Sequence, residues 1–199
     1  MPRLLKAAFS IAPLFLVAAT PPGIQKFEQL NPHVYRGGQP TQAGFQALAK
    51  MGVRTVLDLR DRAAQTRRER QMVESLGMRF VTIPMSMGEP TDGEMAHIID
   101  QLNASDAWPL FVHCQGGRDR TSAVIACYRI QHDGWTNQQA YNEALRHGIS
   151  SLDIGLRRYI LRYKNPSAPA NPPSSLCGSP APGKNGDRER RDKPACCRG

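Results

Sequence analysis

The sequence predicts an α/β fold, with a central, mostly parallel sheet of four to five strands flanked by helices and a helical C-terminal third. Short β-rich runs alternate with helical stretches between residues 31 and 164, which is the pattern of parallel strands joined by crossover helices. The composition, 40% hydrophobic and 22% charged, is typical of globular proteins. About 145 residues remain once both ends are set aside, enough for one buried core and too few for two large domains.

The first half of this domain is expected to hold three strands and two helices. Residues 34–36 give a short strand, which the Gly-Gly-Gln-Pro run at 37–40 interrupts. Thr41 can cap a helix that runs to Met51 and stops at Gly52. The remaining elements of this half are a central strand over residues 54–59, a helix stopped by Gly77, a strand over 78–84 and the loop 85–90.

The second half begins with a helix whose start is encoded locally. Thr91 and Glu94 have the spacing of a capping box, and one face of the helix should be buried through Met95, Ile98, Ile99 and Leu102. Residues 109–113 then form a buried strand, and a glycine-rich loop leads into residues 122–130, which have the composition of a buried helix. Two further helices are expected, from Thr136 to near Gly148 and over residues 152–163.

Both ends of the chain differ from this domain, which we place at residues 31–164. Residues 1–19 carry Arg3 and Lys6, then 13 mostly apolar residues ending in Val-Ala-Ala, as in an export signal. That run is too short to cross a hydrocarbon core of about 30 Å. We therefore expect a cleaved signal peptide and a periplasmic or secreted protein. The alternatives are an uncleaved membrane anchor and a cytosolic protein with an N-terminal helix.

Residues 20–30 are expected to be a linker, and residues 165–199 a disordered, basic, proline-rich tail with seven prolines. The five cysteines are an odd number, so at least one thiol stays free. In an oxidising compartment Cys177 can pair with Cys196 or Cys197, which leaves Cys114 and Cys127 in the domain. The tail has neither histidine nor Cys-x-x-Cys spacing, so no zinc site is expected there.

The net charge of +9 is divided among the three parts of the chain. Residues 1–19 carry +2 and residues 165–199 carry +3, which leaves +4 for the rest. This modest excess favours an anionic small ligand or a phosphorylated substrate, and it argues against a nucleic acid partner.

Chemistry is expected at residues 113–121, His-Cys-Gln-Gly-Gly-Arg-Asp-Arg-Thr, where a strand passes through a loop into a helix. A cysteine and an arginine at this spacing are weak evidence alone, because chance gives about 0.5 such pairs in this composition. The context makes the signal specific: His before the cysteine, glycine at the third intervening position, Thr after the arginine, a strand before and a helix after.

The residue types in this loop suit a bound phosphate. Its glycines let backbone N–H groups turn inward, and the helix N-terminus adds positive potential at the same point. That field stabilises a thiolate, so Cys114 should be a nucleophile. Arg120 can bind two phosphate oxygens through its planar guanidinium. The rest of the expected phosphate-binding loop is Gln115, Gly116, Gly117, Arg118 and Asp119.

These residues resemble the signature of the cysteine-dependent protein phosphatases, His-Cys-x5-Arg-Thr/Ser, which is matched by His113, Cys114, Gly117, Arg120 and Thr121. The resemblance implies a protein tyrosine phosphatase-like fold and hydrolysis of phosphomonoesters, with no metal or organic cofactor. It also implies roles. Cys114 carries a phosphocysteine, Arg120 binds phosphate, and the Thr121 hydroxyl helps the thiolate leave. For His113 we expect a role in orienting the loop through backbone hydrogen bonds, with proton transfer as the alternative.

The wider order, with Val-Tyr-Arg-Gly-Gly-Gln-Pro at residues 34–40 and a helical C-terminal third, is most similar to the compact atypical dual-specificity phosphatases. The similarity covers about residues 31–164. One departure is Ser122, where glycine is usual.

Phosphatases of this kind also need an aspartic acid that protonates the leaving group. Asp92, 22 residues before Cys114, resembles the acid-loop position of the compact family. Asp119, inside the loop, is the alternative, as in relatives that carry Asp-Arg-Thr. Each also has a structural explanation, Asp92 as helix N-terminal charge and Asp119 as a loop brace.

The substrate class stays open at this point. Phosphorylated Tyr, Ser or Thr of proteins is the first expectation, and phosphoinositides or inositol polyphosphates and pyrophosphates are the alternative. A rhodanese-like sulfurtransferase with a persulfide on Cys114 and a non-catalytic phosphate-binding module are the rival functions.

Overall fold

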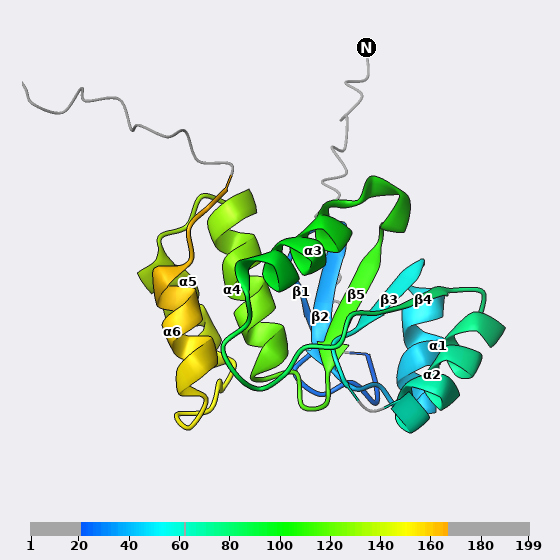
Figure 1. The fold of residues 1–199 in the computed structure, drawn as a ribbon. Coiled ribbons are helices and arrows are strands. Elements are labelled where there is room, and N and C mark those ends of the chain that lie inside the picture. The colour runs from blue at the N-terminus through cyan, green and yellow to red at the C-terminus, as the bar shows by residue number, and fades with distance from the viewer. Residues whose placement is uncertain (1–20, 62, 167–199) are drawn as a thin grey trace, which may run out of the picture. The chain divides into compact units, whose positions relative to one another are not determined.

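A five-stranded sheet in the order β1-β2-β5-β3-β4 lies at the centre of the structure (Figure 1). The computed structural model describes residues 21–61 and 63–166. Strands β2 (Val34–Gly38), β5 (Leu110–Cys114), β3 (Thr55–Asp58) and β4 (Arg79–Thr82) run parallel, and β1 (Glu28–Gln29) pairs antiparallel with β2. The predicted mostly parallel sheet is therefore confirmed, and β5, the strand before the glycine-rich loop, has a neighbour on both sides.

Helices cover both faces of the sheet (Figure 1). On one face lie α1 (Gln42–Lys50) and α2 (Ala63–Ser75), and on the other lie α3 (Asp92–Asn103) and α4 (Arg120–His132). A short 3-10 helix, η1 (Ser105–Ala107), precedes β5. Helices α5 (Asn137–Arg146) and α6 (Ile154–Arg162) pack against α4. The predicted helical C-terminal third is confirmed.

The alternation of side chains along the strands divides the core into two clusters. Val56 and Phe111 contribute to the cluster under α1 and α2, whereas Leu57 and Val112 point to the opposite cluster under α3 and α4. All four side chains are fully buried. Burial of such a side chain stabilises the fold by about 1.5–3 kcal/mol, so the sheet is held from both faces.

The local helix signals are confirmed where they depend only on neighbouring residues. The capping box joins Thr91 and Glu94 at the start of α3, and Thr136 forms the same motif at the start of α5. The predicted inner face of α3 is buried. Gly52 and Gly77, predicted as helix stops, have φ angles of 82° and 78°, a left-handed backbone that suits glycine.

Two expectations about the start of the domain are corrected. Gly37 and Gly38 do not interrupt the first strand, because they are the last residues of β2 and pair with His113 and Cys114. Residues 21–30, expected as a linker, carry β1 and the buried Ile24.

Residues 1–19 and the tail from 167 onward, with Cys177, Cys196 and Cys197, lie outside the described residues. Within the described part of the chain, Cys114 and Cys127 are both free thiols and both buried. No helix of that part has the length and apolar character needed to span a bilayer.

Candidate active site

The loop from Cys114 to Arg120 joins the end of β5 to the start of α4, as the sequence predicted. Cys114 is the last residue of the strand and is only 3% exposed. Asp119 occupies the N-cap position of α4, but its side chain makes no capping hydrogen bond there. The first N–H groups of a helix have no intrahelical partner, so those of α4 are available to an anion held in the loop.

The loop lies directly against the end of β2, and glycines make this approach possible. Gly117 has a φ of 67°. A Cβ atom on Gly117 would lie 2.5 Å from the carbonyl carbon of Gly37 and 2.5 Å from the nitrogen of Gly38. The Gly-Gly pair of β2 thus forms one wall of the loop. A Cβ on Gly38 would in turn lie 3.1 Å from the carbonyl carbon of Gly116, so this close approach needs glycine at Gly38 and at Gly117.

A buried arginine, Arg36, makes hydrogen bonds to the loop and to the start of α4. Arg36 is fully buried, and its guanidinium donates to the carbonyl oxygen of Gly117 and to Oγ of Ser122, both at 2.8 Å. Burial lowers the pKa of Arg36, although Glu28, Glu143 and Cys114 oppose this shift. Ser122, the departure noted in the sequence, therefore accepts a hydrogen bond from Arg36. Residue order alone gave no sign of this contact.

Arg120 points across the loop toward the segments that follow β3 and β4. Its Nη1 donates to the carbonyl oxygens of Leu59 and Met85, both at 3.3 Å. The carboxylate of Asp61 lies 4.0 Å from the same nitrogen and is 65% exposed. Sequence reasoning did not select Asp61, since it lies 53 residues before Cys114 and outside any motif.

Thr121 is fully buried, and its hydroxyl has no hydrogen-bond partner among the residues that the structure describes. A buried hydroxyl without a partner is costly. The residue follows Arg120 in the first turn of α4, beside the phosphate loop.

His113 lies in a buried charged cluster that the sequence did not predict. Its Nδ1 is 3.1 Å from the carbonyl oxygen of Cys114, and its Nε2 is 2.7 Å from Oε1 of Glu69. The guanidinium of Arg60 bridges the two carboxylates of the cluster. It donates to both oxygens of Asp58 at 2.8 Å and to Glu69. The cluster fixes the imidazole that contacts the backbone of the nucleophile candidate.

The predicted phosphate-binding side chains differ in exposure. Gln115 and Arg118 are exposed, and Asp119 is partly buried. The amide of Gln115 donates to Oε1 of Gln39 at 3.0 Å, and the backbone N–H of Gln39 donates to the carbonyl oxygen of Gln115 at 3.1 Å. Gln39 is thus a direct neighbour of the loop, and sequence reasoning missed it.

Asp92, the first candidate for the general acid, begins α3 and faces α6. Its carboxylate accepts a hydrogen bond from the hydroxyl of Tyr159 at 3.0 Å and lies 4.0 Å from Nη1 of Arg162. The side chain is 84% exposed. Burial and this hydrogen bond raise the pKa of Tyr159. No hydrogen bond or ion pair among the described residues joins Asp92 to the loop.

Asp119, the alternative, is held by the segment between α5 and α6. Its Oδ1 accepts the backbone N–H of Ser150 at 2.7 Å, which is the loop-bracing contact considered for it. A second carboxyl, Asp153, lies beside it. Burial and the charge of Asp119 raise the pKa of Asp153, and Arg120 and Arg118 oppose this effect. Sequence reasoning missed Asp153, whose proximity depends on the packing of α6.

Two groups of side chains in the described part of the chain have the donors for a metal ion: Asp58, Glu69 and His113, and Glu28, Glu143 and His147. In the first, Arg60 pairs with both carboxylates. In the second, Arg129 pairs with Glu143. Arginines of the chain itself therefore already balance carboxylate charge in both groups.

A family model described as "DSP-PTPase phosphatase fused to NAD+ Kinase" matches residues 11–154. The chain belongs to this family. The matched range includes the whole loop from Cys114 to Arg120 and the Gly37–Gly38 pair that packs against it.

Known relatives agree with this assignment. The dual specificity protein phosphatase TpbA of Pseudomonas aeruginosa is 28% identical over 137 residues, which covers 68% of this chain and 60% of TpbA. The putative tyrosine-protein phosphatase OCA1 of Saccharomyces cerevisiae is 30% identical over 127 residues, which covers 60% of this chain and 52% of OCA1. The chain therefore spans about 60% or less of the length of these relatives.

Solved structures share the DSP-PTPase fold. The core catalytic domain of the PP-IP phosphatase SIW14 from S. cerevisiae superposes with a TM-score of 0.63 at 19% identity, covering 71% of this chain and 86% of that one. TpbA of P. aeruginosa in complex with pTyr gives 0.59 at 24% identity, covering 73% and 91%. At these identities the likeness establishes the fold.

Proposed function

We propose that this chain hydrolyses phosphomonoesters, with phosphorylated Tyr, Ser or Thr of proteins as the first substrate class. The observation that carries the proposal is the loop itself. Cys114 ends a central strand, Arg120 begins a helix, and the glycine-rich loop between them leads to a helix N-terminus whose first N–H groups have no intrahelical partner. The family and the relatives named phosphatases support the same activity.

In the proposed reaction, the Cys114 thiolate attacks phosphorus and the ester oxygen leaves with a proton from an aspartic acid. Arg120 turns from the carbonyl oxygens that it contacts here to bind two oxygens of the transferring group. Water then attacks the phosphocysteine, phosphate leaves, and the thiolate is regenerated. The unpaired hydroxyl of Thr121 suits a role as donor to the departing sulfur.

We keep Asp92 as the first candidate for the acid and Asp119 as the second, and two Asn variants separate them. A general acid matters most for a poor leaving group. Asp92→Asn should therefore lower kcat for phenyl phosphate about 100-fold. It should lower kcat far less for a fluorinated aryl phosphate, whose leaving group needs little protonation. A selective loss in Asp119→Asn alone would assign the proton to the loop residue.

The first experiment is hydrolysis of p-nitrophenyl phosphate in EDTA by the reduced chain, compared with Cys114→Ser and Arg120→Ala. We expect turnover in the wild type and its loss in both variants. Tungstate binding without turnover would instead favour a phosphate-binding module, and thiocyanate formed from thiosulfate and cyanide would favour a sulfurtransferase.

A specific observation also keeps inositol pyrophosphates as a second candidate substrate class. A Cβ on Gly148 would lie 3.7 Å from both Nζ of Lys26 and Cδ of Arg118, so two exposed cations gather beside the phosphate loop. They can meet further phosphates of one ligand. The fold neighbour SIW14 is itself a PP-IP phosphatase. Comparison of kcat/KM for a phosphotyrosine peptide and an inositol pyrophosphate, in wild type and Lys26→Glu, tests this.

We further propose that residues 1–19 direct export and are removed. The support is the order of residues in that segment, in which Arg3 and Lys6 precede a mostly apolar run that ends in small residues. N-terminal sequencing of the protein from a periplasmic or culture fraction should begin near residue 20. An intact N-terminus in the membrane fraction would favour an anchor.

A further inference from the structure

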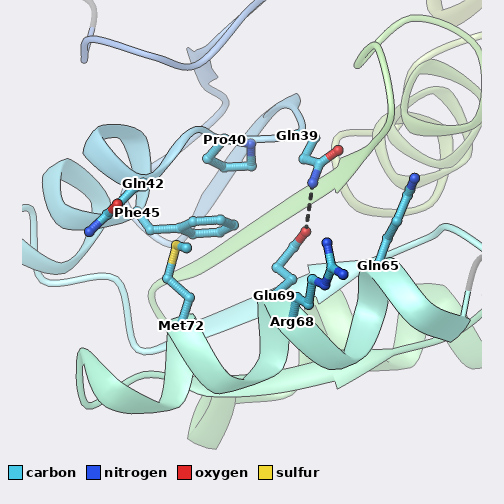
Figure 2. A pocket seen from close by; sticks show the side chains of 8 residues that line it. All are labelled: Gln39, Pro40, Gln42, Phe45, Gln65, Arg68, Glu69 and Met72. Carbon is cyan, nitrogen blue, oxygen red and sulfur yellow. Dashed lines mark hydrogen bonds between the residues drawn. The ribbon is translucent and has the colours of Figure 1, made fainter.

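An open pocket lies between α1 and α2. It is next to the phosphate loop, because its lining residue Gln39 contacts Gln115 of that loop. Figure 2 shows its lining: Gln39 and Pro40 before α1, Gln42 and Phe45 on α1, and Gln65, Arg68, Glu69 and Met72 on α2. The α2 residues recur at helical spacing and so form one face of that helix. The catalytic scheme above uses none of these side chains. We call this feature the α1–α2 pocket.

A single residue separates the pocket from the phosphate loop. The side chain of Gln39 accepts a hydrogen bond from Gln115 on the loop side at 3.0 Å. On the pocket side it donates to Glu69 at 3.2 Å (Figure 2). Gln39 is thus a lining residue that also contacts the loop, and in the strand register its neighbour Gly38 lies opposite Cys114. Gln39 follows Gly38 in the chain and is itself part of the lining, so we expect the atoms next to a phosphate held at Cys114 to pass over Gln39 toward the pocket.

The floor of the pocket is apolar. The ring of Phe45 and the thioether of Met72 face each other across it, with Pro40 beside them (Figure 2). Its volume is about 290 Å³, at the low end for ligand sites, which suits one large side chain rather than an entire ligand.

The rim of the pocket carries a free positive charge. Arg68 is exposed and has no ion pair among the residues that the structure describes. Of the neighbouring charges, Glu69 pairs with Arg60 and His113, and Arg70 pairs with Glu74. Arg67 also has no ion pair among the described residues, but it lies outside the lining of the pocket. An arginine left unpaired beside an apolar floor is complementary to a carboxylate on a ligand whose body is apolar.

We propose that the α1–α2 pocket binds the peptide segment next to the phosphorylated residue of a protein substrate, with an apolar side chain on the floor and an adjoining Asp or Glu at Arg68. This rests on the proposed function and deepens it, because it names acidic phosphopeptides as the preferred substrates of the same site. The pocket is a specificity site and takes no part in the bond changes.

The test measures binding and turnover separately. Fluorescein-labelled phosphotyrosine peptides bind to full-length Cys114→Ser, and polarisation gives Kd. The panel moves a Leu-Glu pair through the three positions on each side of phosphotyrosine in an alanine background. One placement should lower Kd about fivefold, the size expected for one exposed charge contact together with partial apolar burial.

Matched variants in the Cys114→Ser background assign that gain to the pocket. Arg68→Glu should remove the contribution of the glutamate, and Gln42→Trp should block the floor and remove that of the leucine. The controls Arg67→Glu and Gln46→Trp make the same changes at exposed positions of the same helices outside the lining and should keep the preference. Equal losses in Arg67→Glu and Arg68→Glu would overturn the proposal in favour of general attraction.

Turnover of p-nitrophenyl phosphate by the wild type reports the proposed function independently, because this ester has no peptide segment. If the wild type turns over the ester but no peptide placement is favoured, the proposal for the α1–α2 pocket is wrong and the proposed hydrolase activity stands. A favoured placement without turnover overturns the hydrolase and leaves the pocket as a phosphopeptide-binding site. If neither turnover nor phosphopeptide binding is found, both proposals fall.

Discussion

Replacement of Arg60 by methionine should destabilise the fold strongly. Among the described residues, Arg60 is the one guanidinium that contacts both Asp58 and Glu69. Their side chains are 0% and 2% exposed, so Arg60→Met leaves two carboxylates buried without that cation. Removal of one partner of a buried ion pair costs about 3–5 kcal/mol.

This free energy gives a measurable shift in the unfolding temperature. In a domain of about 145 residues, each kcal/mol lowers Tm by about 2–4 °C, so a loss of about 3–5 kcal/mol in Arg60→Met should lower Tm by about 6–20 °C. Thermal unfolding followed by circular dichroism measures it, with urea unfolding as a second readout. The matched control is Arg70→Met, which breaks an exposed pair with Glu74 and should cost less than about 1 kcal/mol.

A triple variant distinguishes the cost of unpaired buried charge from the cost of altered packing. When Asp58→Asn, Arg60→Met and Glu69→Gln are combined, no unpaired charge stays buried, and much of the lost stability should return. The reasoning is refuted if Arg60→Met is no less stable than Arg70→Met. It is also refuted if the neutral triple variant is as unstable as Arg60→Met alone.

Three further outcomes follow from the loop, the second thiol and the β1 contact. Gly117→Ala places a Cβ 2.5 Å from the Gly37 backbone, so tungstate binding by calorimetry should be lost while the far-UV spectrum stays native; retained binding would contradict the close packing. Burial raises the pKa of the Cys127 thiol well above its usual range, so iodoacetamide at pH 8 should leave Cys127 unmodified until urea is added, as peptide mapping will show. A hydrogen bond with His147 lowers the pKa of Glu28 from its usual 4.5 although burial opposes this, so its stabilisation is present above that pH and is lost as pH falls through the lowered pKa. The Tm difference between wild type and Glu28→Gln should therefore shrink between pH 6 and pH 3, and a constant difference would argue against the ion pair.

Features encoded by near neighbours in the chain could be predicted from the sequence. The capping boxes at Thr91 and Thr136 need only a residue three positions ahead, and the buried face of α3 follows from helical spacing. The phosphate loop is equally local, because strand end, loop and helix start are consecutive. These signals predicted the element types, the two-sided sheet and the position of the site.

Contacts between distant segments were not predictable in the same way. Glu69 lies in the run Arg-Arg-Glu-Arg, which is typical of a solvated helix face, yet α2 places it on His113, 44 residues away. Gly37 and Gly38 were expected to end the first strand, since glycine weakens strands. A Cβ on Gly38 would lie 3.1 Å from the carbonyl carbon of Gly116, 78 residues later, and one on Gly37 would meet Ile24 and Phe111. Only the packing around the β2–β5 pair reveals these contacts.

The central place of β5 has a consequence for how the protein loses its proposed activity. A strand paired on both sides exchanges its amide hydrogens only when the sheet as a whole opens, whereas β1 and β4 can fray at the edges. Because Cys114 is the last residue of β5 and its loop also packs on β2, we expect the proposed nucleophile to belong to the slowest-opening unit of the described part of the chain. Inactivation by denaturant should therefore coincide with global unfolding rather than precede it.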